Sequence, residues 1–163
     1  MNPQSKQQTP AGAETAFKST LSHPRIGYHG GTAAEINSGI FFIAHDRSLA
    51  EEYASDTAGG RVVKVEDRSV NPLVLDTPEK FIDAWRKSGA DKVEGNFHPN
   101  QTRVFGDWAR HSGYDAIVIP ESAFEGELGY EEVGGTVGEP QTIILDPKVA
   151  NIVSGRQNNK GRA

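Results

Sequence analysis

Apolar residues gather in the middle of the chain, and both ends are polar. Residues 1–22 are rich in Gln, Pro, Ser, Thr and Ala, with Phe17 and Leu21 as the only large apolar residues after the first. A segment of this composition cannot bury enough apolar surface to offset the entropy lost on ordering. We therefore expect a disordered leader over 1–22, one folded domain over 23–153 and a flexible tail over 154–163.

Short apolar runs predict β-strands towards both ends of the folded domain. The run at 40–44 is apolar at successive positions, which indicates a strand buried on both faces. Turn-forming Asn71-Pro72 separates two other runs. The predicted strands cover residues 25–29, 40–44, 61–65, 73–75, 114–119 and 142–145.

Helical patterns lie between these strands. Asp46 can cap a helix over 47–55, in which Leu49 and Tyr53 share a face because they are four residues apart. We expect this helix to deliver Tyr53 to a buried place. Two further helices are predicted, one over 78–88 that begins after Thr77 and stops at Gly89, and one from 99 or 100 to 111.

The stretch 121–138 is rich in Gly and Glu and has few apolar residues. It predicts a long loop, with an extended piece at 130–133. Because strands cluster at both ends of the domain and helices lie between them, the fold class is predicted to be α+β with a split, mostly antiparallel sheet.

Composition narrows the class of protein. A chain of 163 residues fits one domain with its own core, and a net charge of -5 argues against nucleic-acid binding through phosphate contacts. The absence of cysteine excludes disulfides and thiolate zinc sites, and the histidines show no metal-ligand spacing. Without a membrane-spanning run or a secretory signal, we expect a soluble protein that is cytoplasmic or delivered into a host cell.

Three consecutive segments carry the candidate chemistry. They are Tyr28-His29-Gly30-Gly31-Thr32, Gly39-Ile40-Phe41-Phe42-Ile43 and Glu52-Tyr53-Ala54. In order and spacing they resemble the front half of the NAD site of the ADP-ribosyltransferase superfamily, in the diphtheria-toxin and poly-ADP-ribose-polymerase branch with the His-Tyr-Glu signature. Small domains of this kind occur as bacterial or phage effectors and toxins.

The resemblance implies a fold of two packed β-sheets with NAD in the cleft between them. It also implies the cofactor-binding residues. His29 would bind the ribose, the backbone of Gly30 would approach the nicotinamide carboxamide, and Phe42 and Tyr53 would stack on the nicotinamide ring. The family motif has Tyr-His-Gly-Thr, so the extra Gly31 leaves the role of Thr32 open.

The carboxylate of the signature departs from the family pattern. In the family a glutamate opens a late strand and stabilises the ribosyl cation, but the matching position here is Gln141. Glu139 lies two residues earlier and faces the same side of an extended chain. We expect Glu139, Gln141 and Tyr53 to be the catalytic residues, with Glu131 and Glu132 as alternative carboxylates.

The resemblance thus implies a mono-ADP-ribosyltransferase that moves ADP-ribose from NAD to a protein acceptor without a metal. Two alternatives stay open. Water could replace the acceptor, which would make the protein an NAD glycohydrolase on the same site. Gln141 also fits a catalytically inactive module that binds NAD or a protein.

Overall fold

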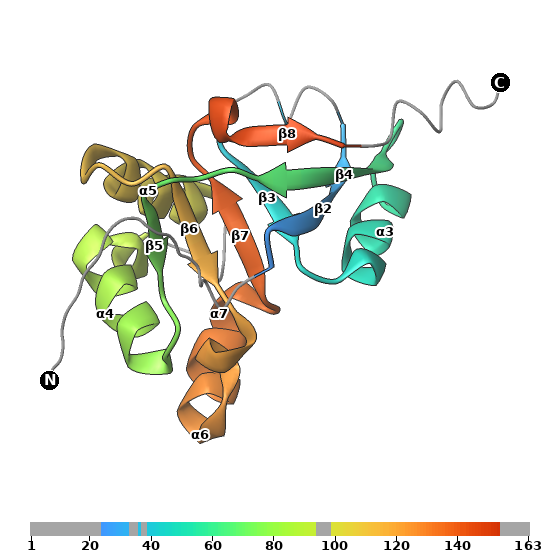
Figure 1. Ribbon diagram of the computed structural model, residues 1–163. Helices are drawn as coiled ribbons and strands as arrows, with labels where there is room; N and C mark the ends of the chain where they lie inside the picture. Colours follow the sequence, from blue (N-terminus) through green and yellow to red (C-terminus); the bar gives the residue numbers. More distant parts are fainter. Residues whose placement is uncertain (1–23, 33–35, 37–38, 94–98, 154–163) are drawn as a thin grey trace, which may run out of the picture.

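The protein has an α+β fold in which helices pack on a strongly curled, mixed sheet of seven strands (Figure 1). A computed structural model describes residues 24–32, 36, 39–93 and 99–153. The predicted leader 1–22 and tail 154–163 lie outside the described residues. The predicted α+β class is confirmed.

The strands follow the order β5-β6-β7-β3-β2-β4-β8 across the sheet. All neighbours are antiparallel except β5 and β6, which are parallel. The bounds are β2 Ile26–Gly31, β3 Phe41–Ala44, β4 Arg61–Asp67, β5 Pro72–Val74, β6 Ala116–Ile119, β7 Gln141–Ile144 and β8 Ala150–Ile152. β8 was not predicted from the sequence, because its three residues are too few to show a pattern.

The sheet is weakest where β2 meets β3. In the register of these strands Tyr28 pairs with Ala44 and no further described residues pair, whereas β2 and β4 are paired along the whole of β2. Strand pairing therefore links a three-stranded part, β2-β4-β8, to a four-stranded part, β5-β6-β7-β3, through one residue pair among the described residues. The arrangement as two separate sheets is not confirmed, because this pair still links all seven strands.

Local sequence signals account for the longer helices. The side chain of Asp46 accepts a hydrogen bond from the backbone N–H of Ser48 and caps α3, Arg47–Ser55. Thr77 caps α4, Pro78–Ser88, which ends at Gly89 with φ +83°. The third long helix is α5, Pro99–His111. These helices confirm the predicted ones.

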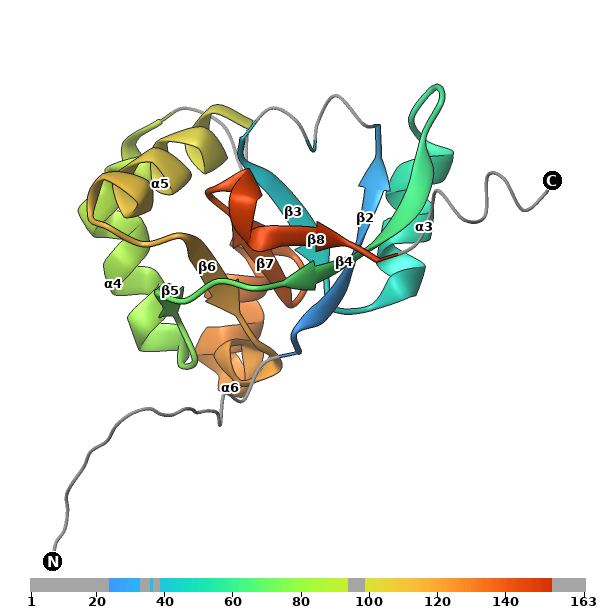
Figure 2. The same cartoon turned by 45° about the horizontal axis from the view of Figure 1, so that its top comes forward.

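Two apolar clusters hold the helices and strands together. The larger lies between the β5-β6-β7-β3 part of the sheet and helices α4 and α5, which Figures 1 and 2 show on the same side of these strands. Its fully buried aromatic residues are Phe81 and Phe105. The smaller cluster contains Phe41, Ile43, Val65 and Ile144, and lies on the other face of the sheet.

The prediction of a long loop over 121–138 is wrong. The chain forms a series of short helical turns there, with bounds Glu121–Phe124, Gly126–Leu128, Gly129–Val133 and Gly134–Val137. The expected extended piece at 130–133 lies in the third of these turns, a π-helix. Val133 and Val137 are buried in the larger core and anchor the turns.

None of the helices in the described part of the chain combines the length and the apolar character that a membrane span needs.

Candidate functional site

Strand pairing brings four distant parts of the chain together at one end of the central strands of the sheet. Gln141 opens β7 and pairs with Ala44, the last residue of β3, and with Ile119, the last residue of β6. The segments that follow β3 and β6 and the one that precedes β7 must therefore meet. Pro24, just before β2, joins them.

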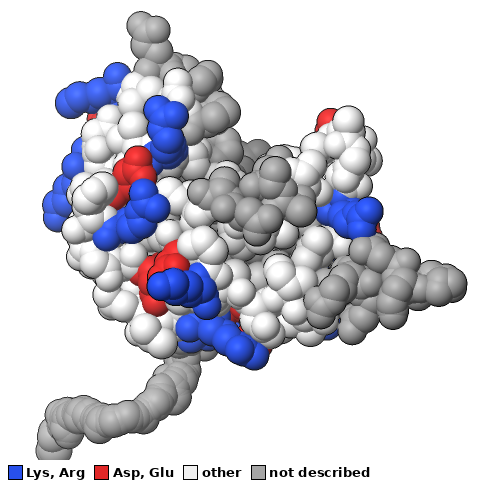
Figure 3. Space-filling model, turned by 90° about the horizontal axis from the view of Figure 1, so that it is seen from above, with Lys and Arg blue, Asp and Glu red and all other residues white. Residues whose placement is uncertain are grey.

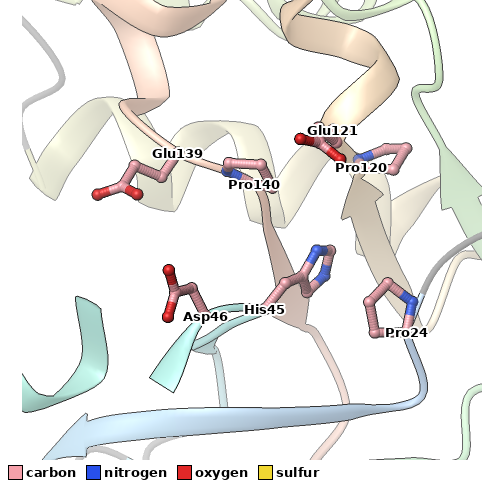
Figure 4. Close-up of a pocket in the computed structure, with 7 residues that line it drawn as sticks. All are labelled: Pro24, His45, Asp46, Pro120, Glu121, Glu139 and Pro140. Carbon is pink, nitrogen blue, oxygen red and sulfur yellow. The ribbon is translucent and has the colours of Figure 1, made fainter. Parts of the chain in front are cut away.

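These segments surround an open cavity of about 480 Å³. Its size is within the range of small-molecule sites. Figure 4 shows that the carboxylates of Glu139 and Asp46 lie towards the same side of the cavity, with His45 between Asp46 and Pro24. The lining residues are Pro24, His45, Asp46, Pro120, Glu121, Glu139 and Pro140.

His45 and Asp46 are fixed by neighbouring groups. The backbone N–H of His45 donates to the carbonyl oxygen of Pro140 at 3.4 Å, and its Nε2 lies 2.8 Å from the hydroxyl of buried Thr142. The backbone N–H and the hydroxyl of Ser48 donate to Asp46 and lower its pKa. Asp46 is therefore a carboxylate at neutral pH.

Tyr53 lies on α3 within electrostatic range of Glu139. Burial raises the pKa of Tyr53, and the charges of Glu139 and Glu52 raise it further. The phenol is thus neutral at physiological pH. Tyr53 remains 50% exposed, and the residue that α3 buries is Ala50. The expectation that the helix delivers Tyr53 to a buried place is wrong; it presents the ring at the surface.

Gly30 is required by the packing of α3. A Cβ atom at this position would overlap the carbonyl group of Ala50. The helix can therefore cross β2 only where the strand has no side chain. This close approach explains the glycine through the fold alone, and its expected approach to nicotinamide remains a prediction.

His29 lies next to the single residue pair of β2 and β3 and connects these strands through its side chain. Its Nδ1 lies 2.8 Å from the carbonyl oxygen of Phe42, and because a carbonyl can only accept, this nitrogen carries the proton. The ring is buried and meets Phe41 edge to face at 5.3 Å. His29 therefore bridges the two parts of the sheet.

Phe42 and Gln141 lie on the face of the sheet that carries α4 and α5. Cross-strand partners share a face, and Phe42 pairs with Ile143 of the larger core. Phe42 packs against that core. His29 faces the opposite side, because its partner is Val63, which packs against the smaller core.

Gln141 is a buried support for the loop before β7. Its amide nitrogen donates to the carbonyl oxygens of Val137 at 2.9 Å and of Glu139 at 3.1 Å. An amide supplies both of these hydrogens, whereas a carboxylate supplies neither. The side chain thus holds the backbone on which Glu139 stands.

Gln141→Glu would match the family pattern but is expected to destabilise the protein by about 3 kcal/mol at neutral pH, because a buried carboxylate would face two carbonyl oxygens without a donor. Burial raises the pKa of an introduced carboxyl, so this loss is complete above that pKa and shrinks as the pH falls towards 4. Urea denaturation of both proteins at pH 5 and pH 8 measures it. Equal stability of the two proteins at pH 8 would contradict this role of Gln141.

The alternative carboxylates expected from the sequence are not part of the cavity lining. Glu131 and Glu132 are exposed on the π-helical turn and do not line the cavity. Three lining residues, His45, Asp46 and Glu121, were missed as site residues. The signal that could have identified them was their position just after the buried strands β3 and β6, whose last residues both pair with the first residue of β7.

No group of three or more acidic, histidine or cysteine residues is placed to hold a metal ion within the part of the chain that the structure describes. Comparisons with protein-family models, with curated proteins and with solved structures found no match to this chain. The function is therefore inferred from the residues of the site.

Proposed function

We propose that the protein is an NAD-dependent mono-ADP-ribosyltransferase that modifies a protein acceptor. The observation that carries the proposal is that Glu139, in the loop before β7, lines the cavity and lies near enough to Tyr53 of α3 for its charge to raise the pKa of the phenol. The resemblance assigns a tyrosine of this helix to the nicotinamide ring and a glutamate at the position of Gln141 to the ribose, and Glu139 lies two residues before that position. The fold supports that pairing, since the two residues are 86 positions apart in the chain.

The chemistry requires negative charge near the ribose. Cleavage of the bond between nicotinamide and ribose develops positive charge on the sugar, and a fixed carboxylate stabilises that charge. Glu139 would supply it, while the neutral phenol of Tyr53 offers its aromatic face to the pyridinium ring of NAD. Asp46 adds a second negative charge to the same side of the cavity.

His29, Gly30 and Phe42 keep secondary roles in this proposal. The single join between β2 and β3 supports a split sheet of the expected kind, and His29 lies in that split. A shift of Phe42 away from the larger core would be needed before its ring could stack on nicotinamide. Gln141 acts as a positioning residue for Glu139.

The rival function is an NAD-binding module without transferase activity. It is favoured by one observation, the commitment of the Gln141 amide to backbone carbonyls at the position where the family has its glutamate. NAD glycohydrolysis uses the same site with water as acceptor.

The test is incubation of the purified protein with NAD labelled in its adenylate part and with a cell lysate. We expect label on a protein band together with free nicotinamide. Free nicotinamide without labelled protein would indicate glycohydrolysis, and the absence of both would leave the binding module.

Tyr53→Ala is expected to raise the KM for NAD about tenfold through the loss of ring stacking. The matched control is Tyr130→Ala, because Tyr130 is a more exposed tyrosine, at 78%, and stands on the π-helical turn Gly129–Val133, not on α3. Initial rates of nicotinamide release over a range of NAD concentrations give both values. An equal KM for the two variants would argue against stacking on Tyr53.

A further inference from the structure

The cavity beside Glu139 is lined mainly by hydrogen-bond acceptors. Three of its seven residues are acidic and three are prolines, which have no backbone N–H. Its histidine uses its backbone N–H and its Nε2 in contacts with Pro140 and Thr142. Such a lining suits a ligand that brings several donors and positive charge.

None of the described residues that line the cavity is a lysine or an arginine. Within the described residues, neither Glu121 nor Glu139 forms an ion pair, whereas Glu51, Asp76 and Asp83 each pair with a cation of their own helix or its flank. The part of the chain that the structure describes therefore supplies no cation that pairs with Glu121 or Glu139.

The surroundings of the cavity are also acidic. Residues 121–139 contain six glutamates and no lysine, arginine or histidine. These six glutamates alone account for the net charge of the whole chain, which is -5. On the face seen in Figure 3, by contrast, basic side chains stand among acidic ones. A cationic ligand would be drawn to the end of the molecule that carries the cavity.

We propose that this cavity binds the guanidinium group of an arginine side chain, and that arginine is the residue that the protein modifies. This inference rests on the proposed ADP-ribosyl transfer. A guanidinium presents five donors in one plane, accepts no hydrogen bonds and stays charged. It can contact Glu121 and Asp46 from different edges while its plane lies against the proline rings.

The position of Glu139 connects the two sites. It lines the cavity and also acts on Tyr53, so an arginine in the cavity would lie beside the ribose of NAD. One guanidinium nitrogen forms a bond to C1′ of the ribose as the bond from C1′ to nicotinamide breaks. Nicotinamide leaves as a neutral molecule with that electron pair, and the proton lost by the guanidinium nitrogen passes to Glu121.

Lysine fits the same lining less well. Its ammonium is a compact, strongly hydrated charge that cannot bridge separated carboxylates with a planar set of donors. The neutral analogue citrulline keeps the shape of arginine but replaces a donor group with a carbonyl oxygen. A comparison of these three side chains therefore distinguishes the contributions of charge, planarity and shape to binding in the cavity.

The first experiment measures binding without NAD. N-acetyl-arginine amide, N-acetyl-lysine amide and N-acetyl-citrulline amide are titrated into the full-length protein, and the dissociation constants are taken from NMR shifts. We expect the arginine compound to bind at least about tenfold more tightly than the citrulline compound, as for one charged hydrogen bond. Equal binding of arginine and citrulline, or of arginine and lysine, would overturn the assignment.

Glu121→Gln is expected to weaken binding of the arginine compound about tenfold. The control is Glu79→Gln, because Glu79 is an exposed glutamate of α4 outside the cavity and the substitution changes the net charge equally. Circular dichroism checks that both variants are folded. The same affinity in both variants would also overturn the assignment.

The second experiment separates this inference from the proposed function. Agmatine, which carries the guanidinium group, is added with NAD, and free nicotinamide and ADP-ribosylated agmatine are quantified. Formation of the adduct supports both proposals. Nicotinamide release without the adduct overturns arginine as the acceptor and leaves NAD cleavage standing; arginine binding without any nicotinamide release overturns the transferase and leaves the guanidinium site standing.

Discussion

Glu139→Gln is expected to lower the rate of ADP-ribosyl transfer about a hundredfold while the protein remains folded. Glutamine keeps the shape of the side chain but removes the negative charge opposed to the ribosyl cation. The effect should fall on kcat, because the charge develops in the transition state and stabilises it more than the bound substrate. Nicotinamide release at saturating NAD measures it.

The stability of Glu139→Gln should match that of the original protein, since Glu139 is exposed and only its backbone is held by the Gln141 amide. Glu127→Gln serves as the matched control, because Glu127 is an exposed glutamate of the helical turn Gly126–Leu128 that does not line the cavity. It should retain full activity. A fully active Glu139→Gln protein would show that another group stabilises the cation.

Gly30→Ala is expected to reduce the free energy of unfolding by about 3 kcal/mol. The added methyl group would overlap the backbone carbonyl of Ala50, and backbone cannot rotate away as a flexible side chain can. Helix α3 must then move off β2, which also displaces Tyr53. Thermal denaturation should show a melting temperature lower by roughly 6–12 °C.

Gly135→Ala provides the comparison for that substitution. Gly135 lies in the helical turn Gly134–Val137, and nothing stands within 4 Å of a Cβ built there. Alanine favours helix, so this variant should be as stable as the original or up to about 1 kcal/mol more stable. If both glycine variants unfold at the same temperature, the packing of α3 on Gly30 is not as close as described.

Much of the fold follows from local signals. The cap residues Asp46 and Thr77 mark the starts of α3 and α4, and alternating or continuous apolar runs mark the strands. The stretch 121–138 failed as a prediction because its glycines disfavour a helix and its few apolar residues show no clear helical spacing. Its helical turns depend on Val133 and Val137, four residues apart, which are buried by contact with distant parts of the chain.

The site was harder to predict than the fold. Tyr53 and Glu139 could be proposed from the resemblance, but the cavity depends on the register in which Gln141 meets Ala44 and Ile119. A one-residue slip in either ladder would turn different side chains towards it. No local pattern in the sequence encodes such a register, so the position of His45, Asp46 and Glu121 after buried strands did not by itself show that they share one location.

The single pair between β2 and β3 has a consequence for motion. Proteins open in cooperative units, and a boundary that few backbone hydrogen bonds cross is a natural border between two of them. The unit of β2, β4, β8 and α3 carries Tyr53, and the loop that carries Glu139 belongs to the other unit. Breathing along this border would loosen the smaller apolar cluster, in which Phe41 and Ile43 of one unit pack with Val65 of the other. It would also alter the separation of Tyr53 and Glu139, so the sheet itself can serve as the hinge of the proposed NAD site.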